Sequence, residues 1–437
     1  MGIKTFLGNL FGSSDQQMPS SLGQEKTQET KADNLGNNIH QEKEASQMKE
    51  AADQTSQKEE TSKATENKAT ESKTEDKKQS APACATYNLI ILDESGSMFH
   101  VRQQTISGCN ETLNSIRNTA KEQPQIKQYV SIFCFDNQHS RYIFQNVPIE
   151  ETRDLTPEDY KPNGCTPLYD AIGYTVTQLR SFIAGSDSVG VVTILTDGYE
   201  NASRKWYLQS VVDLIASLKK QGWVFTFIGA NIDVEKTARG MGIDSFVEFE
   251  QSDTGMKDMF EKERLSRRAY NTKRSYMRSM TGFADMPCEE RKMMYASMNH
   301  NYFVDKVRIA PDYIQSLNSD EIFVFGSNVL GQHTGGAALY AIEHFGAIDR
   351  HAEGLQGQSY AIPTHGCTFE ELKDAVARFT KFVVMHPQNK FMLTAIGCGA
   401  AGYSVEQIAP FFRQVYSFGN VYVPKAFLPF MSEDDIF

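Results

Sequence analysis

Oxygen-bearing side chains suited to a divalent cation occur in three separate segments of this 437-residue chain. In the segment DESGS, Asp93, Ser95 and Ser97 occupy alternate positions directly after the apolar run YNLIIL. A carboxylate and two hydroxyls spaced in this way on a tight turn can direct their oxygens at one centre, as Mg²⁺ or Mn²⁺ requires. Thr166 in NGCTPLYDAIG adds a hydroxyl, and Asp197 in ILTDGYENAS adds a second carboxylate. The sequence therefore predicts one metal site built from three loops.

The predicted site requires a fold that brings the ends of several strands to one edge. Apolar runs typical of buried strands alternate with segments of helical periodicity from residue 87 to about 249. This alternation predicts a Rossmann-like, doubly wound, mostly parallel α/β sheet, which binds ligands at the carboxyl ends of its strands. The expected strands are 87–93, 128–135, 141–148, 189–197 and 223–231, and the expected helices are 101–120, 167–184 and 205–220, followed by a short helix and strand.

In their order and content, these three segments resemble the metal-ion-dependent adhesion site of von Willebrand factor A domains. The resemblance covers roughly residues 86–250, and all five positions of the motif are filled. It implies that the hydroxyls hold the cation directly or through water, with help from the carboxylates. Two carboxylates leave a divalent ion about neutral with one position open, which an acidic side chain of a protein partner can complete. The residues to which the resemblance assigns this Mg²⁺ or Mn²⁺ are Asp93, Ser95, Ser97, Thr166 and Asp197.

Other polar residues near the three segments are not expected to bind the metal or to take part in catalysis. Glu94 and Glu200 lie close in sequence to the predicted ligands, but acids in exposed loops are usually solvated. His100 is expected to be a surface side chain, and no Ser, His and Asp set with the spacing of a catalytic centre accompanies it. Hydrolysis by this domain is therefore not predicted.

A second series of apolar runs and helical periods begins at about residue 320. It predicts another, smaller parallel-type α/β sheet, with strands at 321–328, 359–364, 390–399 and 421–424 and helices at 335–345, 369–384 and from about 404. Two glycine-rich loops follow strands in this unit, and small residues there let backbone amides approach an anionic ligand. The candidate ligand-binding residues are Gly326, Asn328, Gly331, Gly335, Gly336, Gly397, Gly399 and Gly402.

With these loops and the segment SYAIPTHG between them, the unit resembles macrodomains, particularly short phage and bacterial ones. The resemblance implies an ADP-ribose-like ligand, with the second loop holding its diphosphate. FGSN replaces the usual NAAN, and no acidic residue stands at the strand end where adenine is commonly recognised. The alternative interpretation is that the glycines only make tight turns and close helix packing.

The remaining segments predict a four-part organisation. Residues 13–82 contain no Phe, Tyr, Trp, Val or Cys, and such a stretch buries too little apolar surface to fold. The charged and Met-rich stretch after residue 250 is interpreted as a helical linker with a solvated charged face, since no aromatic residues alternate with its charges to stack on nucleic acid. The expected parts are a disordered tail at 1–85, the A-type domain at 86–250, the linker at 251–305 and the macrodomain-like domain at 306–437.

Charge and cysteine usage restrict the expected partners and location. The net charge of −11 disfavours a nucleic-acid partner. Seven scattered cysteines without a CxxC pair disfavour a zinc site and a disulfide framework, which fits a reducing cytoplasm. The amino-terminal apolar run is too short to span a membrane and lacks a signal-peptide cleavage site.

Two functions follow as hypotheses. The first is an intracellular, metal-dependent protein-binding scaffold whose carboxyl-terminal domain senses an ADP-ribose-like nucleotide. The alternative is an ADP-ribosyl hydrolase, in which the A-type domain selects the substrate and the carboxyl-terminal domain acts on it. No catalytic residue is assigned in either case.

Overall fold

The computed structural model describes residues 84–250, 252–299 and 302–431. The predicted tail therefore lies almost entirely outside the described residues. Within them, the first sheet has six strands in the order β3-β2-β1-β4-β5-β6, and all neighbours are parallel except β3, which runs antiparallel to β2. The strands are β1 (Ala85–Asp93), β2 (Lys127–Phe135), β3 (Arg141–Pro148), β4 (Val189–Thr196), β5 (Val224–Gly229) and β6 (Ser245–Glu248).

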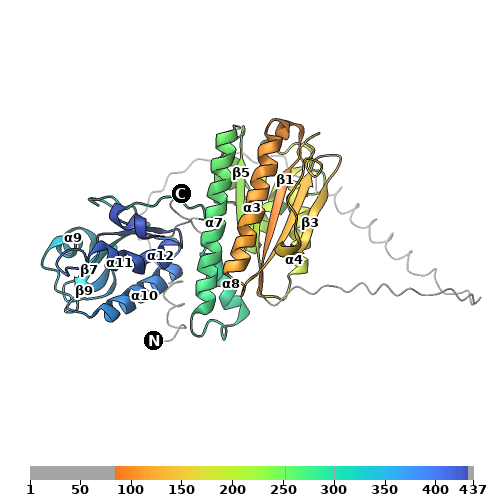
Figure 1. The fold of residues 1–437 in the computed structure, drawn as a ribbon. Helices are drawn as coiled ribbons and strands as arrows, with labels where there is room; N and C mark the ends of the chain where they lie inside the picture. The colour runs from red at the N-terminus through yellow and green to blue at the C-terminus, as the bar shows by residue number, and fades with distance from the viewer. Residues whose placement is uncertain (1–83, 251, 300–301, 432–437) are drawn as a thin grey trace, which may run out of the picture. The chain divides into compact units, whose positions relative to one another are not determined.

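Helices cover both faces of this sheet. The side chains of Leu89 and Ile91 in β1 pack with one set of helices, while Ile90 and Leu92 pack with the other, because successive residues of a strand face opposite sides. Figure 1 shows α3 and α7 side by side on one face and α4 on the other. The predicted doubly wound α/β fold is confirmed. One face carries α4 (Leu168–Phe182), α5 (Leu208–Lys219) and α6 (Val234–Gly240), and the other carries α3 (Arg102–Glu122) and α7 (Asp253–Ser279).

The charged helix α7 differs from its predicted solvated state. Arg267 is only 1% exposed and donates to Asn88 Oδ1 at 2.5 Å and to Thr193 Oγ1 at 2.8 Å, both on the sheet. Glu263, one helical turn earlier, pairs with the same guanidinium and is equally buried. The prediction of a solvated face is wrong here. A buried arginine loses its hydrogen bonds to water, and polar side chains on β1 and β4 take the place of those water molecules as partners.

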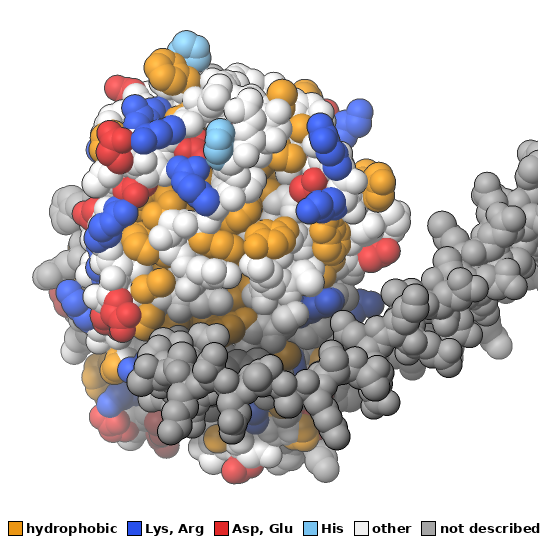
Figure 2. Space-filling view, turned by 90° about the vertical axis from the view of Figure 1, so that its right-hand side faces the viewer, with side chains coloured by type: hydrophobic (Ala, Val, Ile, Leu, Met, Phe, Trp, Pro, Cys, Tyr) orange, Lys and Arg blue, Asp and Glu red, His pale blue; other side chains and the backbone are white. Residues whose placement is uncertain are grey.

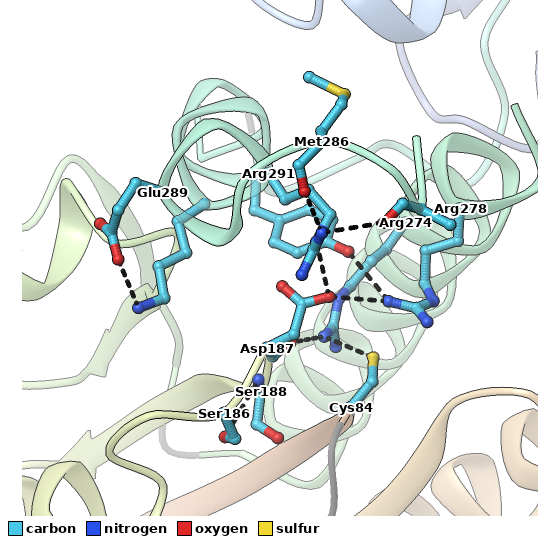
Figure 3. A network of polar contacts seen from close by, with 12 residues as sticks. Cys84, Ser186, Asp187, Ser188, Arg274, Arg278, Met286, Glu289 and Arg291 are labelled. Atoms are coloured by element: carbon cyan, nitrogen blue, oxygen red, sulfur yellow. Dashed lines mark hydrogen bonds and ion pairs between the residues drawn. The ribbon is translucent and has the colours of Figure 1, made fainter. Parts of the chain in front are cut away.

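A second polar network holds α7 and α8 (Cys288–Ser297) to the amino-terminal edge of the sheet (Figure 3). Arg278 and Arg291 both pair with Asp187 Oδ2, at 2.9 and 3.1 Å. Arg274 is fully buried and donates to the backbone oxygens of Asp187 and Ala85, each at 3.1 Å. The helix after the last strand is thereby fixed along the length of the sheet, with the opposite edge left for the loops that follow β1 and β4.

The second sheet has the order β11-β10-β7-β9-β8 within the described residues. β7, β9, β10 and β11 are parallel, and β8 runs antiparallel to β9. α9 packs on one face through Phe323 and Phe325, while the ring of Phe379 in α10 lies against Tyr360 and Phe391 on the other. The elements are β7 (Glu321–Asn328), α9 (Gly336–Phe345), β8 (Gly354–Gln356), β9 (Ser359–His365), α10 (Phe369–Met385), β10 (Lys390–Leu393), α11 (Val405–Ile408), α12 (Arg413–Tyr416) and β11 (Val421–Tyr422).

This second α/β unit agrees with the prediction except near its end. The strand expected to reach residue 399 stops at Leu393, because the following segment turns at Gly397 and Gly402, both with positive φ. The helix expected from about 404 is short, and a 3₁₀ turn containing Pro410 separates it from α12. Among the described residues, no helix is long and apolar enough to cross a membrane.

Candidate metal site

The candidate site lies at the carboxyl end of the two central strands of the first sheet. Asp93 is the last residue of β1, and Asp197 directly follows Thr196, the last residue of β4. These strands pair in parallel, so both acidic residues leave the sheet at the same edge. Thr166 stands in the loop just before Pro167 and α4, and this loop reaches the same edge. The fold therefore brings the three predicted loops together.

Direct contacts join the first and third loops. The Ser97 hydroxyl donates to Asp197 Oδ1 at 2.5 Å, and the Oγ atoms of Ser95 and Ser97 lie 3.2 Å apart. The backbone amide of Ser95 donates to Asp93 Oδ1 at 2.7 Å, which holds the turn closed. Four of the five predicted ligands are thus linked to one another without any intervening residue.

The side chains of Thr166 and Asp93 both lie close to Gly198. A Cβ atom added at Gly198 would lie 3.0 Å from Thr166 Oγ1 and 3.9 Å from Asp93 Oδ2. The loop of Thr166 is fixed by Asn201, whose side-chain oxygen accepts from the Thr166 amide at 2.9 Å. The structure accordingly places the fifth predicted ligand beside the other four, and the loops approach each other closely at Gly198.

The site is buried on one side and open on the other. Asp93, Ser95, Thr166 and Asp197 are buried, whereas Ser97 is exposed. Burial raises the pKa of Asp93 to about 6; hydrogen bonds from Thr196 and Ser95 oppose this shift, and the charge of Asp197 adds to it. A cation at this edge would have the two carboxylates on its buried side and solvent on the side of the Ser97 hydroxyl.

Glu94 and Glu200 are not the solvated acids expected from the sequence. Glu94 is 1% exposed and pairs with Arg141 at 2.5 Å, so its charge is already compensated. Glu200 accepts from the backbone amides of Tyr169 and Ser203 at 2.9 and 2.7 Å. Both side chains hold the loops in place. The described part of the chain has no group of three or more His, Cys, Asp or Glu side chains placed to bind a metal, so hydroxyl oxygens are needed to complete this site.

Sequence reasoning missed the residues that support the predicted ligands. Thr196 donates to Asp93 Oδ2 at 2.5 Å, and the Tyr160 hydroxyl donates to the Asp93 backbone oxygen at 2.6 Å. Thr196 directly precedes Asp197, and a polar residue at the end of the largely apolar strand VGVVTILT is a usable signal. Tyr160 and Asn201 carry no comparable signal, because only the folded loops bring them to β1 and Thr166.

The glycine loops of the second sheet also converge at one edge. A Cβ at Gly326 would lie 2.9 Å from Thr364 Oγ1 in β9 and 3.6 Å from the Gly397 amide nitrogen. Asn328 accepts from the amides of Leu330 and Gln332, each at 3.0 Å, and so holds its own loop. Positive φ angles occur at Gly331, Gly336, Gly397 and Gly402, whereas Gly335 and Gly399 have open space where a Cβ would stand.

Of the eight predicted ligand-binding residues, Gly336 alone lines the cavity nearest to these loops. A cavity of about 530 Å³ lies at the amino-terminal end of α9, lined by Gly336, Tyr313, Tyr340 and Thr394 among others. His333 is buried, and neither ring nitrogen has a hydrogen-bond partner among the described residues. Burial raises the pKa of the Cys398 thiol, which disfavours the reactive thiolate.

Comparison with known proteins gives structural matches only. No protein-family model and no curated protein matches the chain. A von Willebrand factor type A protein from Catenulispora acidiphila matches at 12% identity and a TM-score of 0.32, over 42% of this chain and 43% of that protein. The vWF domain of the type V pili tip protein Mfa5 from Porphyromonas gingivalis matches at 9% identity and a TM-score of 0.28, over 41% of this chain and 95% of that domain. The SpRpn10 VWA domain matches at 10% identity and a TM-score of 0.30, over 40% of this chain and 93% of that domain. The chain thus spans less than half of the first of these proteins, and the scores are too low to assign a family.

Proposed function

We propose that the first α/β unit is a metal-dependent protein-binding module. Its metal would be Mg²⁺ or Mn²⁺, and its partner would supply an acidic side chain. The observation that carries the proposal is the convergence of oxygen-bearing side chains from three loops at one strand edge, which joins Ser97 to Asp197 and places Thr166 beside Asp93.

The donor set supports this choice of metal. Carboxylate and hydroxyl oxygens are hard ligands, and Mg²⁺ commonly keeps open or water-filled positions when one or two carboxylates hold it. The two carboxylates balance the charge of a divalent ion, so the bound ion keeps little net attraction for free anions in solution. An acidic side chain on the surface of a protein partner can bind the ion and is also held by the contacts between the two protein surfaces. The exposed position of Ser97 leaves the side from which such a group would approach.

Calorimetric titration of the full chain with MgCl₂ and MnCl₂ tests the metal, and Asp197→Asn tests the site. We expect one ion per chain in the wild type and none in the variant. Asp213→Asn is the matched control, since Asp213 is an exposed helical carboxylate that contacts Gln209. Partner capture from a lysate, compared with and without EDTA, then tests whether binding of protein follows the metal. Equal capture under both conditions would refute the metal-dependent function.

A second candidate function concerns the smaller unit, for which we infer binding of an ADP-ribose-like nucleotide. The cavity at the start of α9 supports it, because its volume of about 530 Å³ and its aromatic side chains Tyr313 and Tyr340 suit a nucleotide-sized ligand. Titration with ADP-ribose, comparing the wild type with Tyr340→Ala, tests it. Absence of binding at millimolar ADP-ribose would refute it, and the hydrolase alternative with it. A cytoplasmic location remains a prediction from the cysteine pattern.

A further inference from the structure

A hollow of about 740 Å³ adjoins the candidate metal site. Cys165 and Pro167, the two neighbours of Thr166, line it, and so does Asn201, which accepts from the Thr166 amide. The hollow and the candidate site therefore share the loop of Thr166 as a wall. A ligand that reaches the metal from solvent passes close to this hollow.

The floor of the hollow is aromatic and fixed in position. The ring of Phe133 lies 4.8 Å from that of Tyr142 and 5.8 Å from that of Tyr174, which is 48% exposed. Trp206 is held against α4, where a Cβ at Gly173 would lie 2.0 Å from its indole. An aromatic floor of this kind suits an aromatic or branched aliphatic side chain.

The hollow is lined by two acidic and two basic side chains, which differ in their hydrogen bonding. Its two carboxylates are occupied by backbone amides: Asp136 accepts from Gln138 at 2.5 Å, and Asp170 accepts from Arg204 and Lys205 at 2.9 Å each. The side chains of Arg204 and Lys205 are exposed and make no ion pair within the described residues. Figure 2 shows the side of the molecule on which β3 and α4 lie, where hydrophobic side chains gather and are surrounded by both basic and acidic side chains.

The chain itself contains a segment that matches this surface. After Met431 the sequence reads SEDDIF, with three acidic residues at 433–435 directly before Ile436 and Phe437. These residues lie outside the described part of the chain. In an extended segment, side chains two residues apart point to the same side and are about 7 Å apart. Asp435 at the metal would therefore direct the ring of Phe437 to the same face, toward the neighbouring hollow.

We propose that the hollow binds the segment Glu433–Phe437 of a second copy of the chain. Asp435 completes the metal shell, Phe437 enters the aromatic hollow, and the other acidic side chains pair with Arg204 and Lys205. The contact joins different surfaces of the two copies, so it is of the head-to-tail kind and produces concentration-dependent assembly. This inference rests on the proposed metal-dependent function.

Fluorescence polarisation with a labelled LPFMSEDDIF peptide, which corresponds to residues 428–437, tests the docking. In Mg²⁺, we expect the full chain to bind it and the Tyr174→Ala variant to bind it about tenfold more weakly, as a lost central aromatic contact does. Arg204→Glu with Lys205→Glu is a second variant, with the same expected direction. Ile348→Ala, at an apolar side chain that is 56% exposed on the other unit, is the matched control and should leave binding unchanged.

Sedimentation of the full chain tests the second copy. We expect the mean mass to rise with concentration in the wild type and to stay at that of a monomer in Phe437→Ala. A monomer at all concentrations would overturn the second-copy assignment, even if the peptide binds. Peptide binding that Tyr174→Ala weakens but EDTA leaves unchanged would refute the metal function and the role of Asp435 at the metal, and would support only the aromatic contact of Phe437. Absence of peptide binding by a chain that does bind Mg²⁺ would refute this inference alone.

Discussion

Replacing Gly198 with alanine should separate metal binding from folding. The added methyl group would stand 3.0 Å from Thr166 Oγ1, whereas an ordinary contact of this kind is at least 3.4 Å, so the two groups must separate by about 0.4 Å. Mg²⁺ holds its oxygens at ~2.0–2.1 Å in nearly ideal octahedral geometry and tolerates little displacement. We expect Mg²⁺ affinity to fall by about tenfold to a hundredfold, the range typical for loss of groups that orient a ligand.

The free energy of unfolding should change much less than the affinity. Replacing glycine with alanine restricts the unfolded chain and stabilises the fold by roughly 0.4–1 kcal/mol, which offsets the strain of a small displacement. Unfolding of the metal-free variant in urea should therefore differ from the wild type by less than about 1 kcal/mol. Calorimetric titration with MgCl₂ provides the affinity.

Gly240→Ala is the matched control for this experiment. Gly240 is the last residue of α6 and has no atom within 4 Å of the position its Cβ would take. The control should keep the wild-type Mg²⁺ affinity. If Gly198→Ala bound Mg²⁺ as tightly as the wild type and the control, Thr166 would not be a ligand and the placement of the site would be wrong.

Two further predictions concern the buried polar groups of each unit. Glu263→Gln leaves Arg267 buried without its carboxylate and should lower the free energy of unfolding by about 3–5 kcal/mol. Glu235→Gln, in an exposed pair, should cost less than about 1 kcal/mol, and equal effects of both substitutions in urea unfolding would contradict the assigned role of the buried pair. Burial lowers the pKa of His386 below its usual 6.5, so the unfolded chain takes up this proton first as the pH falls. Stability should therefore decrease as the pH drops below about 6.5, and less so in His386→Gln; an unchanged pH dependence in that variant, measured by urea unfolding at several pH values, would exclude His386 as the cause.

The strands and the candidate ligands could be predicted because their signals are local. YNLIILD is apolar throughout and ends in an acid, so both the buried strand β1 and the position of Asp93 at its end follow from a single segment. The same holds for Asp197 after β4. The hydroxyl of Thr166 required the resemblance to a known motif, because nothing in its own segment distinguishes it from a residue that precedes a helix.

Features that depend on contacts between distant segments could not be predicted. Arg267 looks like a surface residue of a charged helix, and only the presence of Asn88 and Thr193 on the sheet makes its burial possible. Glu94 looks like an exposed loop acid for the same reason, since Arg141 is 47 positions away. The aromatic hollow is assembled from segments whose aromatic residues each look like core residues when taken alone.

Crystals grown with MnCl₂ and measured for anomalous scattering test the central claim most directly. The account predicts a strong anomalous peak at the carboxyl edge of β1 and β4, within bonding distance of the Ser97 and Thr166 hydroxyls, that disappears in crystals of Asp197→Asn. Mn²⁺ bound only elsewhere, or a peak at this edge that the substitution leaves unchanged, would contradict the account.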